Sequence, residues 1–223
     1  MNHRNIQITE HPTRWGEGNV EIQAGKTCII CTASVSDSVP RFLRESNQSW
    51  LTAEYSMLPR ATHTRTDRDA QRGRVAPRSS EIQRLIGRSL RSSINLKAFS
   101  GYTITLDCDV IQADGGTRTA SITGGCVALF LAIKNHLKDH RAIKDYVAAV
   151  SLGIVDGEIL VDLDYNEDSN AETDMNIVMT KSGKFVEIQG TAEGEAFSYE
   201  HLLGLVDCAK EAMKFVFDAQ DKV

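Results

Sequence analysis

The sequence has few of the features that mark secreted, membrane or disulfide-rich proteins. No segment approaches the roughly 20 apolar residues that span a bilayer, and the first eleven residues contain charges but no apolar run of signal-peptide length. The five cysteines are odd in number and scattered, unlike a disulfide framework. We therefore expect a soluble, cytoplasmic protein with free thiols and no membrane partner.

The sequence also lacks a cluster of histidine and cysteine with the spacing of a zinc site. Cys28 and Cys31 have a spacing found in redox and zinc motifs, but no second cysteine pair follows. Residues 27–35 have the pattern of a buried strand, so we interpret both cysteines as core residues. A thiol nucleophile at Cys126 is a weak alternative, because that residue falls in an apolar helix without an identified histidine partner.

The 223 residues contain 41% apolar side chains, enough for a sizeable core. No linker, repeat or low-complexity tract is visible, and we predict one domain over residues 1–223 with a mixed α+β fold. Apolar periodicity predicts the following elements. Strands are expected at 19–23, 27–35, 102–111, 146–155, 158–165, 174–180 and 184–189, and helices at 80–96, 119–137 and 198–219.

Residues 114–125, Asp-Gly-Gly-Thr-Arg-Thr-Ala-Ser-Ile-Thr-Gly-Gly, connect an alternating, strand-like segment to an apolar helix. Gly115 and Gly116 permit backbone conformations that other residues resist, and Thr117 and Arg118 add hydroxyl and guanidinium donors. Unpaired amides at the start of a helix favour anions. The pattern predicts a phosphate cradle, and an ordinary strand-to-helix turn is the alternative.

The net charge of −5 conceals a strongly basic segment. Residues 60–91 contain nine arginines, no lysine and three acidic residues, a net charge of +6, so the rest of the chain carries −11. Arginine suits bidentate contacts to phosphate groups. We interpret the segment as a nucleic-acid contact, and a solvated charged face is the alternative.

The second half of this basic segment predicts a helix over residues 80–96. Ser80 and Gln83 resemble a capping box, and apolar residues recur at helical spacing after them. Arg78 precedes the expected cap and would lie at the positive end of the helix dipole. We hypothesise that Arg78 and Arg118 bind the same phosphate.

Six acidic residues crowd into the thirteen positions 162–174. Like charges this close require solvent exposure, a raised pKa or a divalent cation among them. Asp174 begins an apolar strand, a rigid position from which a carboxylate can be aimed, and Asp168 precedes it across a polar loop. An all-oxygen pair suits Mg²⁺ or Mn²⁺. A solvated acidic loop is the alternative.

Several long runs of sequence are similar to one known family. They are Cys-Thr-Ala-Ser at 31–34, Val-Pro-Arg-Phe-Leu at 39–43, Met-Leu-Pro-Arg-Ala-Thr-His-Thr-Arg at 57–65, Glu-Ile-Gln-Arg-Leu-Ile-Gly-Arg at 81–88, most of the cradle and its preceding strand at 104–124, Glu-Asp-Ser-Asn-Ala-Glu-Thr-Asp-Met-Asn at 167–176, and Gln-Gly-Thr-Ala-Glu-Gly at 189–194. Through these runs the chain resembles the bacterial ribonuclease PH family of phosphate-dependent 3′-to-5′ exoribonucleases, which trim transfer RNA precursors.

The resemblance implies a fold like domain 2 of ribosomal protein S5, a hexameric ring built as a trimer of dimers, and transfer RNA precursors and other RNA 3′ ends as partners. It also implies a reversible reaction in which inorganic phosphate attacks the last phosphodiester and releases a nucleoside diphosphate. By motif position it assigns phosphate binding to Arg78, Gly116, Thr117 and Arg118, catalysis to Arg118, Asp168 and Asp174, a Mg²⁺ or Mn²⁺ ion to Asp168 and Asp174, and RNA guidance to Arg60, Arg65 and Arg68.

The chain departs from the family pattern at two places. The family's initial Arg-Pro-Asp-Gly-Arg segment is absent before Arg4, and Ala76-Pro77 stands where relatives carry Gly-Arg before Arg78. Pro77 restricts its own φ and that of Ala76, which affects the placement of Arg78. Two other functions are open: a catalytically silent RNA-binding ring subunit and a metal-dependent hydrolytic nuclease.

Overall fold

The computed structural model describes residues 3–138 and 140–223, with the side chains of residues 70 and 72 excepted. Within them, the first half of the chain forms a five-stranded sheet in the order β1-β2-β3-β5-β4. Strands β4 and β5 are parallel and the other pairs are antiparallel. The strands are β1 (Ile6–Glu10), β2 (Gly18–Ala24), β3 (Thr27–Ser36), β4 (Trp50–Met57) and β5 (Thr103–Gln112).

The second half forms a four-stranded antiparallel sheet in the order β7-β6-β8-β9. Its strands are β6 (Val147–Val155), β7 (Glu158–Val161), β8 (Thr173–Thr180) and β9 (Phe185–Ala192). Hairpins join β6 to β7 and β8 to β9, as the turn signals at Asp156-Gly157 and Ser182-Gly183 predict.

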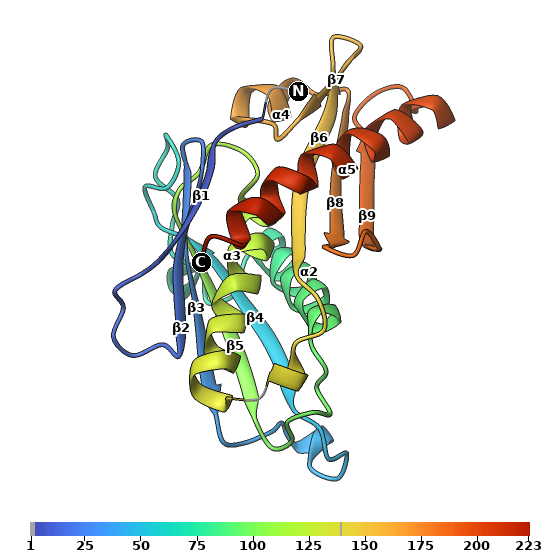
Figure 1. Ribbon diagram of the computed structural model, residues 1–223. Helices are drawn as coiled ribbons and strands as arrows, with labels where there is room; N and C mark the ends of the chain where they lie inside the picture. The colour runs from blue at the N-terminus through green and yellow to red at the C-terminus, as the bar shows by residue number, and fades with distance from the viewer. Residues whose placement is uncertain (1–2, 139) are drawn as a thin grey trace.

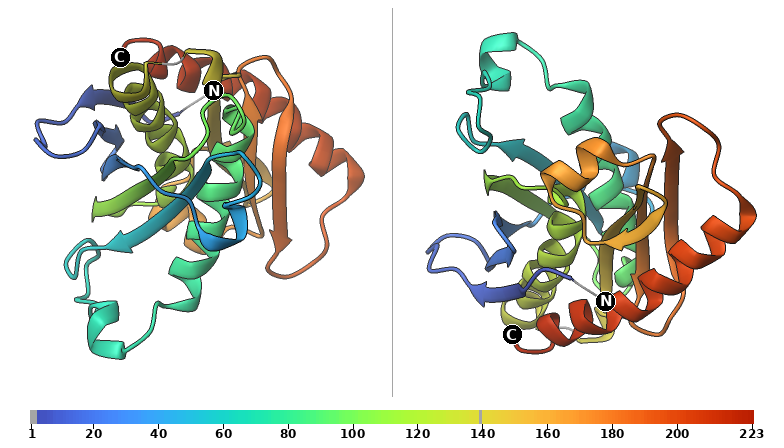
Figure 2. Two further views of the ribbon diagram at one scale, coloured as in Figure 1. Left: turned by 90° about the horizontal axis from the view of Figure 1, so that it is seen from below. Right: turned by 90° about the horizontal axis from the view of Figure 1, so that it is seen from above.

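Helices pack between the two sheets and on the outer face of the second (Figures 1 and 2). Helix α3 contacts β2 and β3 on one side and β6 on the other, α2 contacts β4 and α3, and α5 lies across β6, β7 and β8. The helices are α1 (Asp69–Arg72), α2 (Pro77–Ser93), α3 (Thr117–Ala132), α4 (Tyr165–Asn170) and α5 (Tyr199–Gln220), with short turns η1 (Arg41–Leu43), η2 (Ile133–Leu137) and η3 (His140–Ala142).

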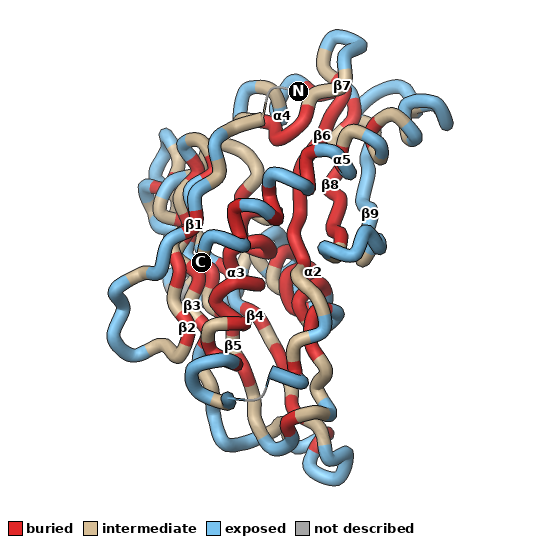
Figure 3. The backbone as a smooth tube through the Cα atoms, in the orientation of Figure 1, coloured by how far each residue is buried: buried red, intermediate tan, exposed pale blue. Residues whose placement is uncertain are grey.

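Strand β6 separates two hydrophobic cores. Val147 and Ala149 belong to the larger core around α2 and α3, whereas Ala148 and Val150 belong to the core beneath α5. Alternate residues of a strand point to opposite faces, so one strand serves both cores. Figure 3 shows β6 and β8 buried along most of their length. The two central strands of the second sheet, β6 and β8, are therefore packed on both faces.

The structure confirms the mixed α+β class and the stripe of apolar residues along the helix over 198–219, which corresponds to α5. Ser198 is its N-cap and accepts a hydrogen bond from the His201 amide. Five free cysteines are also confirmed. Cys31 and Cys108 face each other across β3 and β5, both buried, so Cys31 is a core residue.

Three expected boundaries are wrong. Helix α2 begins at Pro77, not at Ser80, because proline is well suited to the first helical position, and the proposed capping box does not form. The expected strand over 158–165 ends at Val161, and Tyr165 begins α4 instead. The loop expected after Asp168 is partly this helix, whose N-cap Asp164 forms a capping box with Glu167.

One helix within the described residues, Thr117–Leu137, is long and apolar enough to cross a membrane by length and composition alone, contrary to the sequence expectation. It is the core helix α3 with its η2 continuation, and most of its apolar window is buried between the two sheets. A helix that is apolar on all sides is also what a position between two sheets requires.

Candidate active site

A cavity of about 610 Å³ opens where the two halves of the chain meet. The loop after β4, the first turn of α2, the β5–α3 turn, β6, α4 and β8 all contribute to its wall. Arg78, Arg118, Asp168 and Asp174 all line it. Folding therefore brings together two cationic and two anionic side chains that lie far apart in the sequence.

The β5–α3 turn forms one wall of this cavity. Gly115 and Gly116 have φ values of 76° and 64°, the left-handed region that favours glycine. A Cβ atom at Gly115 would lie 2.3 Å from the carbonyl oxygen of Leu163, so only glycine fits there. Gly116 is the N-cap of α3 and no side chain caps the helix. The first amides of α3 are thus available to an anion.

Arg4 holds this turn in place. Its side chain donates to both carboxylate oxygens of Asp162 at 3.0 and 2.6 Å, and to the carbonyl oxygen of Asp114. Asp162 is 8% exposed, and its backbone has a φ of 60°. A buried ion pair with several hydrogen bonds can fix a strained segment. Sequence reasoning did not identify this pair, because 158 positions separate its members.

The two arginines approach the cavity from different helices. Arg118 follows Thr117 at the start of α3 and is anchored by Gln189 at 3.2 Å and Glu81 at 3.5 Å. Arg78 follows Pro77 in the first turn of α2 and is exposed. The positive charges of both arginines lower the pKa of Asp174, against the stronger effect of burial. Both guanidinium groups therefore lie close enough to Asp174 to favour its ionised form.

Asp174 and Asp168 form the anionic side of the cavity. Burial raises the pKa of Asp174, and the negative charge of Asp168 raises it further. The Asn176 amide lies 3.4 Å from the Asp174 carboxylate, at the limit of hydrogen bonding. Two neighbouring carboxylates fit a divalent cation that keeps several waters. No group of three or more histidine, cysteine or acidic side chains in the described residues could hold a metal ion.

Several residues of the cavity were not identified from the sequence. Tyr55 does not line the cavity but contacts one of its lining residues, because the Tyr55 hydroxyl lies 2.8 Å from the Thr117 hydroxyl. Burial raises the pKa of Tyr55, while this hydrogen bond and the charges of Arg78 and Arg118 lower it. The rings of His63 and Tyr165 lie 5.9 Å apart at the cavity wall. Within the motif Met-Leu-Pro-Arg-Ala-Thr-His, the residues that line the cavity are Met57, Thr62 and His63, whereas Arg60 is not among them.

The three arginines expected to guide RNA lie elsewhere. Arg60, Arg65 and Arg68 are exposed on the segment between β4 and α1, and none is among the residues that line the cavity. Arg65 pairs with Asp67 at 2.8 Å, both largely exposed. The structure therefore places these side chains outside the cavity, on the exposed surface between β4 and α1.

Cys126 is buried within α3, and burial raises the pKa of its thiol to about 12. A reactive cysteine needs a low pKa and an accessible sulfur atom. Cys126 has neither property, which removes the thiol nucleophile from consideration.

Comparison with known proteins covers nearly the whole chain. Domain 1 of the 3′ exoribonuclease family, RNase PH, matches residues 2–134, and domain 2 of the same family matches residues 145–212. Residues 135–144 separate the two matches, and the second begins just before β6, the strand that contributes to both cores.

Solved structures with the same fold come from plant and archaeal proteins. Rice (Oryza sativa) Rrp46 has a TM-score of 0.81 at 16% identity, covering 99% of this chain and 94% of that one. A chain of the Archaeoglobus fulgidus exosome with RNA bound to the active site has a TM-score of 0.75 at 19% identity, covering 96% and 88%. A chain of an archaeal exosome core has a TM-score of 0.75 at 18% identity, covering 99% and 87%.

Proposed function

The chain belongs to the RNase PH family of 3′ exoribonucleases, and from this premise we propose that it shortens RNA from the 3′ end with inorganic phosphate as co-substrate. The observation that carries the proposal is the shared cavity of Arg78, Arg118, the uncapped start of α3 and the two carboxylates. A hydrolytic enzyme uses water as nucleophile and has no need of a separate anion site beside its carboxylates.

Phosphate binding follows from the donors on the cationic side of the cavity. The α3 amides, the Thr117 hydroxyl and the guanidinium groups of Arg78 and Arg118 would surround a tetrahedral anion. The negatively charged nucleophile must approach a negatively charged phosphodiester, and the arginines reduce that repulsion. Arg118 is held from two sides by Gln189 and Glu81, so it is oriented before the anion arrives.

The chemical step exchanges one phosphorus–oxygen bond for another. An oxygen of inorganic phosphate forms a bond to the terminal phosphorus, and the bond from that phosphorus to the 3′-oxygen of the preceding nucleotide breaks. The products are a nucleoside diphosphate and an RNA with a free 3′-hydroxyl. The proton carried by the attacking phosphate ends on the 3′-oxygen, and Asp174, with its raised pKa, is placed to assist that transfer.

Asp168 and Asp174 are the residues that would hold a Mg²⁺ or Mn²⁺ ion. Bound there, the ion would supply charge neutralisation at the reacting phosphate and at the leaving oxygen. The carboxylates fit this role because burial and the negative charge of Asp168 raise the pKa of Asp174, and a divalent cation removes that penalty.

We propose that the protein acts on transfer RNA precursors in the cytoplasm. We also propose that it assembles into a homohexameric ring. The exposed arginines Arg60, Arg65 and Arg68 support a contact with the RNA backbone beyond the cavity. The likeness to chains of exosome assemblies, one of them with RNA at its active site, supports both RNA binding and a ring.

A catalytically silent RNA-binding ring subunit is the second candidate. The likeness to an exosome core favours it, since an assembly can contain subunits that only bind. The presence of Arg78, Arg118, Asp168 and Asp174 in one cavity favours activity, because a silent subunit has no need to keep these groups together.

Product analysis separates the candidates. The protein is incubated with a 3′-tailed transfer RNA and Mg²⁺, with and without phosphate. The proposal predicts nucleoside diphosphates only when phosphate is present. Monophosphates in both reactions would identify a hydrolytic nuclease, and binding without release would identify a silent subunit.

A further inference from the structure

Ser151 is a buried polar residue whose hydroxyl group has no partner. It lies in the middle of β6 and is 4% exposed. Its Oγ atom has no hydrogen-bond partner among the described residues. Buried hydroxyl groups are nearly always hydrogen-bonded, because desolvation without a partner is unfavourable. An unpaired buried hydroxyl next to a cavity can take its partner from a ligand or a water in that cavity.

The position of Ser151 places this hydroxyl beside the phosphate cradle. Ser151 lines the same cavity as Arg78 and Arg118. Its Oγ atom lies 3.7 Å from the point where a Cβ atom on Gly116 would stand. Gly116 is the N-cap of α3, so the hydroxyl is near the helix amides that would bind an anion.

The other hydroxyl groups of the cradle already have protein partners. Thr119 donates to the Gly116 carbonyl oxygen at 2.9 Å, and the Thr117 hydroxyl is hydrogen-bonded to that of Tyr55. Ser121 donates to the Thr117 carbonyl oxygen at 2.8 Å. Ser151 alone among these four leaves its hydroxyl unused, although it has the freedom to rotate toward a ligand.

The rigidity of β6 supports a binding role. Both faces of the strand are buried, and Ser151 pairs in register with Asn176 of β8, which also lines the cavity. A donor on a fixed strand loses little freedom when the ligand binds. Ser151 would approach an anion from the second sheet, whereas the two arginines belong to α2 and α3.

We propose that Ser151 donates a hydrogen bond from its side chain to the inorganic phosphate bound at the start of α3, and so sets the affinity for this co-substrate. This inference rests on the phosphate site of the proposed function. A neutral donor adds affinity for the anion without the desolvation penalty of burying a further cation.

The test compares Ser151→Ala with Ser89→Ala. Ser89 is a matched control, because its Oγ atom is also buried and without a partner but lies in α2 outside the cavity. Phosphate binding is measured by calorimetry, and phosphorolysis of a tailed transfer RNA is measured over a range of phosphate concentrations. We expect the phosphate Kd and KM of Ser151→Ala to rise about tenfold, the scale of one hydrogen bond to a charged group. The KM of Ser151→Ala for RNA should stay unchanged, and so should the phosphate Kd and KM of Ser89→Ala.

Thermal unfolding provides a second readout that a merely structural role would not give. Without phosphate, Ser151→Ala should be at least as stable as the wild type, because the variant removes an unpaired buried hydroxyl. With phosphate, its rise in Tm should be smaller than that of the wild type. Wild-type phosphate affinity in Ser151→Ala would overturn the inference. A wild-type protein that binds no phosphate would instead overturn the proposed function, and the inference with it.

Discussion

At the scale of single residues, the account depends on groups whose surroundings change their chemistry. Arg118 is held by Gln189 and Glu81 before any ligand binds, and Asp174 is partly buried beside a second carboxylate. These two side chains line the same cavity and carry opposite charges. Their substitution therefore has different expected effects.

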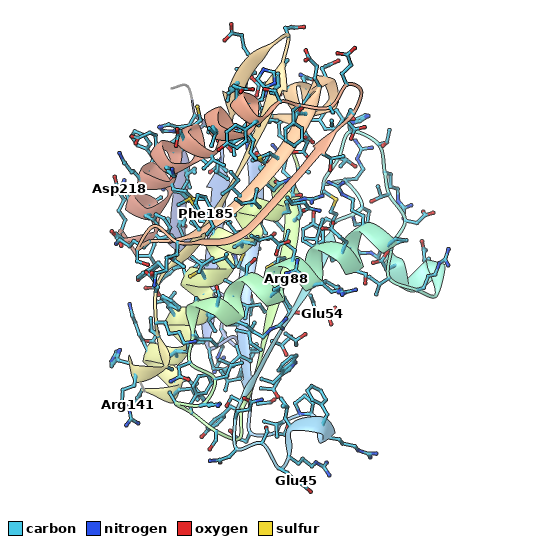
Figure 4. All side chains as sticks on the ribbon, turned by 90° about the vertical axis from the view of Figure 1, so that its right-hand side faces the viewer. Glu45, Glu54, Arg88, Arg141, Phe185 and Asp218 are labelled. Carbon is cyan, nitrogen blue, oxygen red and sulfur yellow. The ribbon has the colours of Figure 1, made fainter. Side chains whose placement is uncertain are left out.

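Replacing Arg118 with alanine removes a donor to the attacking phosphate. We expect the barrier to phosphorolysis to rise by about 2–4 kcal/mol, the scale of one such preorganised donor. Single-turnover rates at saturating RNA measure the effect. Arg88→Ala is the control, because Arg88 pairs with Glu187 of β9 outside the cavity (Figure 4). Equal rates for Arg118→Ala and Arg88→Ala would remove Arg118 from the mechanism.

Replacing Asp174 with asparagine tests whether the negative charge of Asp174 destabilises the folded protein. The pKa of Asp174 is higher in the folded protein than in the unfolded chain. The protonated carboxyl therefore favours folding at a pH below the unfolded pKa. This contribution to stability is lost as the pH rises through the folded pKa. Asp174→Asn should therefore be more stable than the wild type at pH 7, by about 1 kcal/mol or less because the group is only partly buried.

The gain in stability should shrink as the pH falls below 4, where the wild-type carboxyl is itself protonated. Urea unfolding of both proteins at pH 7 and near pH 3.5 provides the measurement. A variant that is less stable than the wild type at pH 7 would show that the Asp174 charge is favourable without a cation, contrary to this account.

At the scale of elements, the β5–α3 turn is the feature that sequence reasoning described best. Its glycines and the alternation of β5 are local signals, and the turn has the conformation that they require. The start of α2 was misplaced because Pro77 at the first helical position determines the boundary more strongly than Ser80. Asp164 and Glu167 form the capping box of α4, but the sequence analysis counts them only as members of the acidic cluster at 162–174.

The remaining site residues could not be identified from local signals. Ser151 lies in a run of buried residues, where the sequence gives no indication that one face meets a cavity. Arg4 and Asp162 are joined only by the packing of β1 against the second half of the chain. Long-range pairing of this kind is determined by the fold as a whole rather than by any segment.

The ion pair between Arg4 and Asp162, and the hydrogen bond from Arg4 to the β5–α3 turn, lead to a stability prediction. Arg4→Ala leaves Asp162 buried without its cation, and we expect a loss of about 3–5 kcal/mol in the free energy of unfolding. The double variant Arg4→Ala/Asp162→Asn should recover part of this loss, since it removes the unpaired charge. Urea unfolding measures both. Unchanged stability of Arg4→Ala would show that the pair does not hold the turn.

At the scale of the whole molecule, charge is separated along the chain. The segment from Arg60 to Arg91 carries +6 within a chain of net charge −5. Its first part is exposed between β4 and α1, beside the cavity wall formed by Thr62 and His63. An RNA with its 3′ end in the cavity would have its backbone available to these arginines.

This arrangement predicts salt-dependent RNA binding. Affinity should fall with a log–log slope of roughly −0.7 for each single-strand phosphate contact. Arg65→Ala should bind more weakly at low salt and show a shallower slope, whereas Lys210→Ala on the exposed face of α5 should change neither. Fluorescence anisotropy at several salt concentrations measures the slopes. Binding that does not respond to salt would contradict the role of the arginine segment.

The central claim is that inorganic phosphate is the nucleophile, and isotope labelling tests it most directly. The protein is incubated with unlabelled 3′-tailed transfer RNA, Mg²⁺ and ³²P-labelled inorganic phosphate, and the released nucleotides are separated. The account predicts that the label appears in the β-phosphate of nucleoside diphosphates. Nucleotides released as unlabelled monophosphates, with all of the label left in inorganic phosphate, would contradict it.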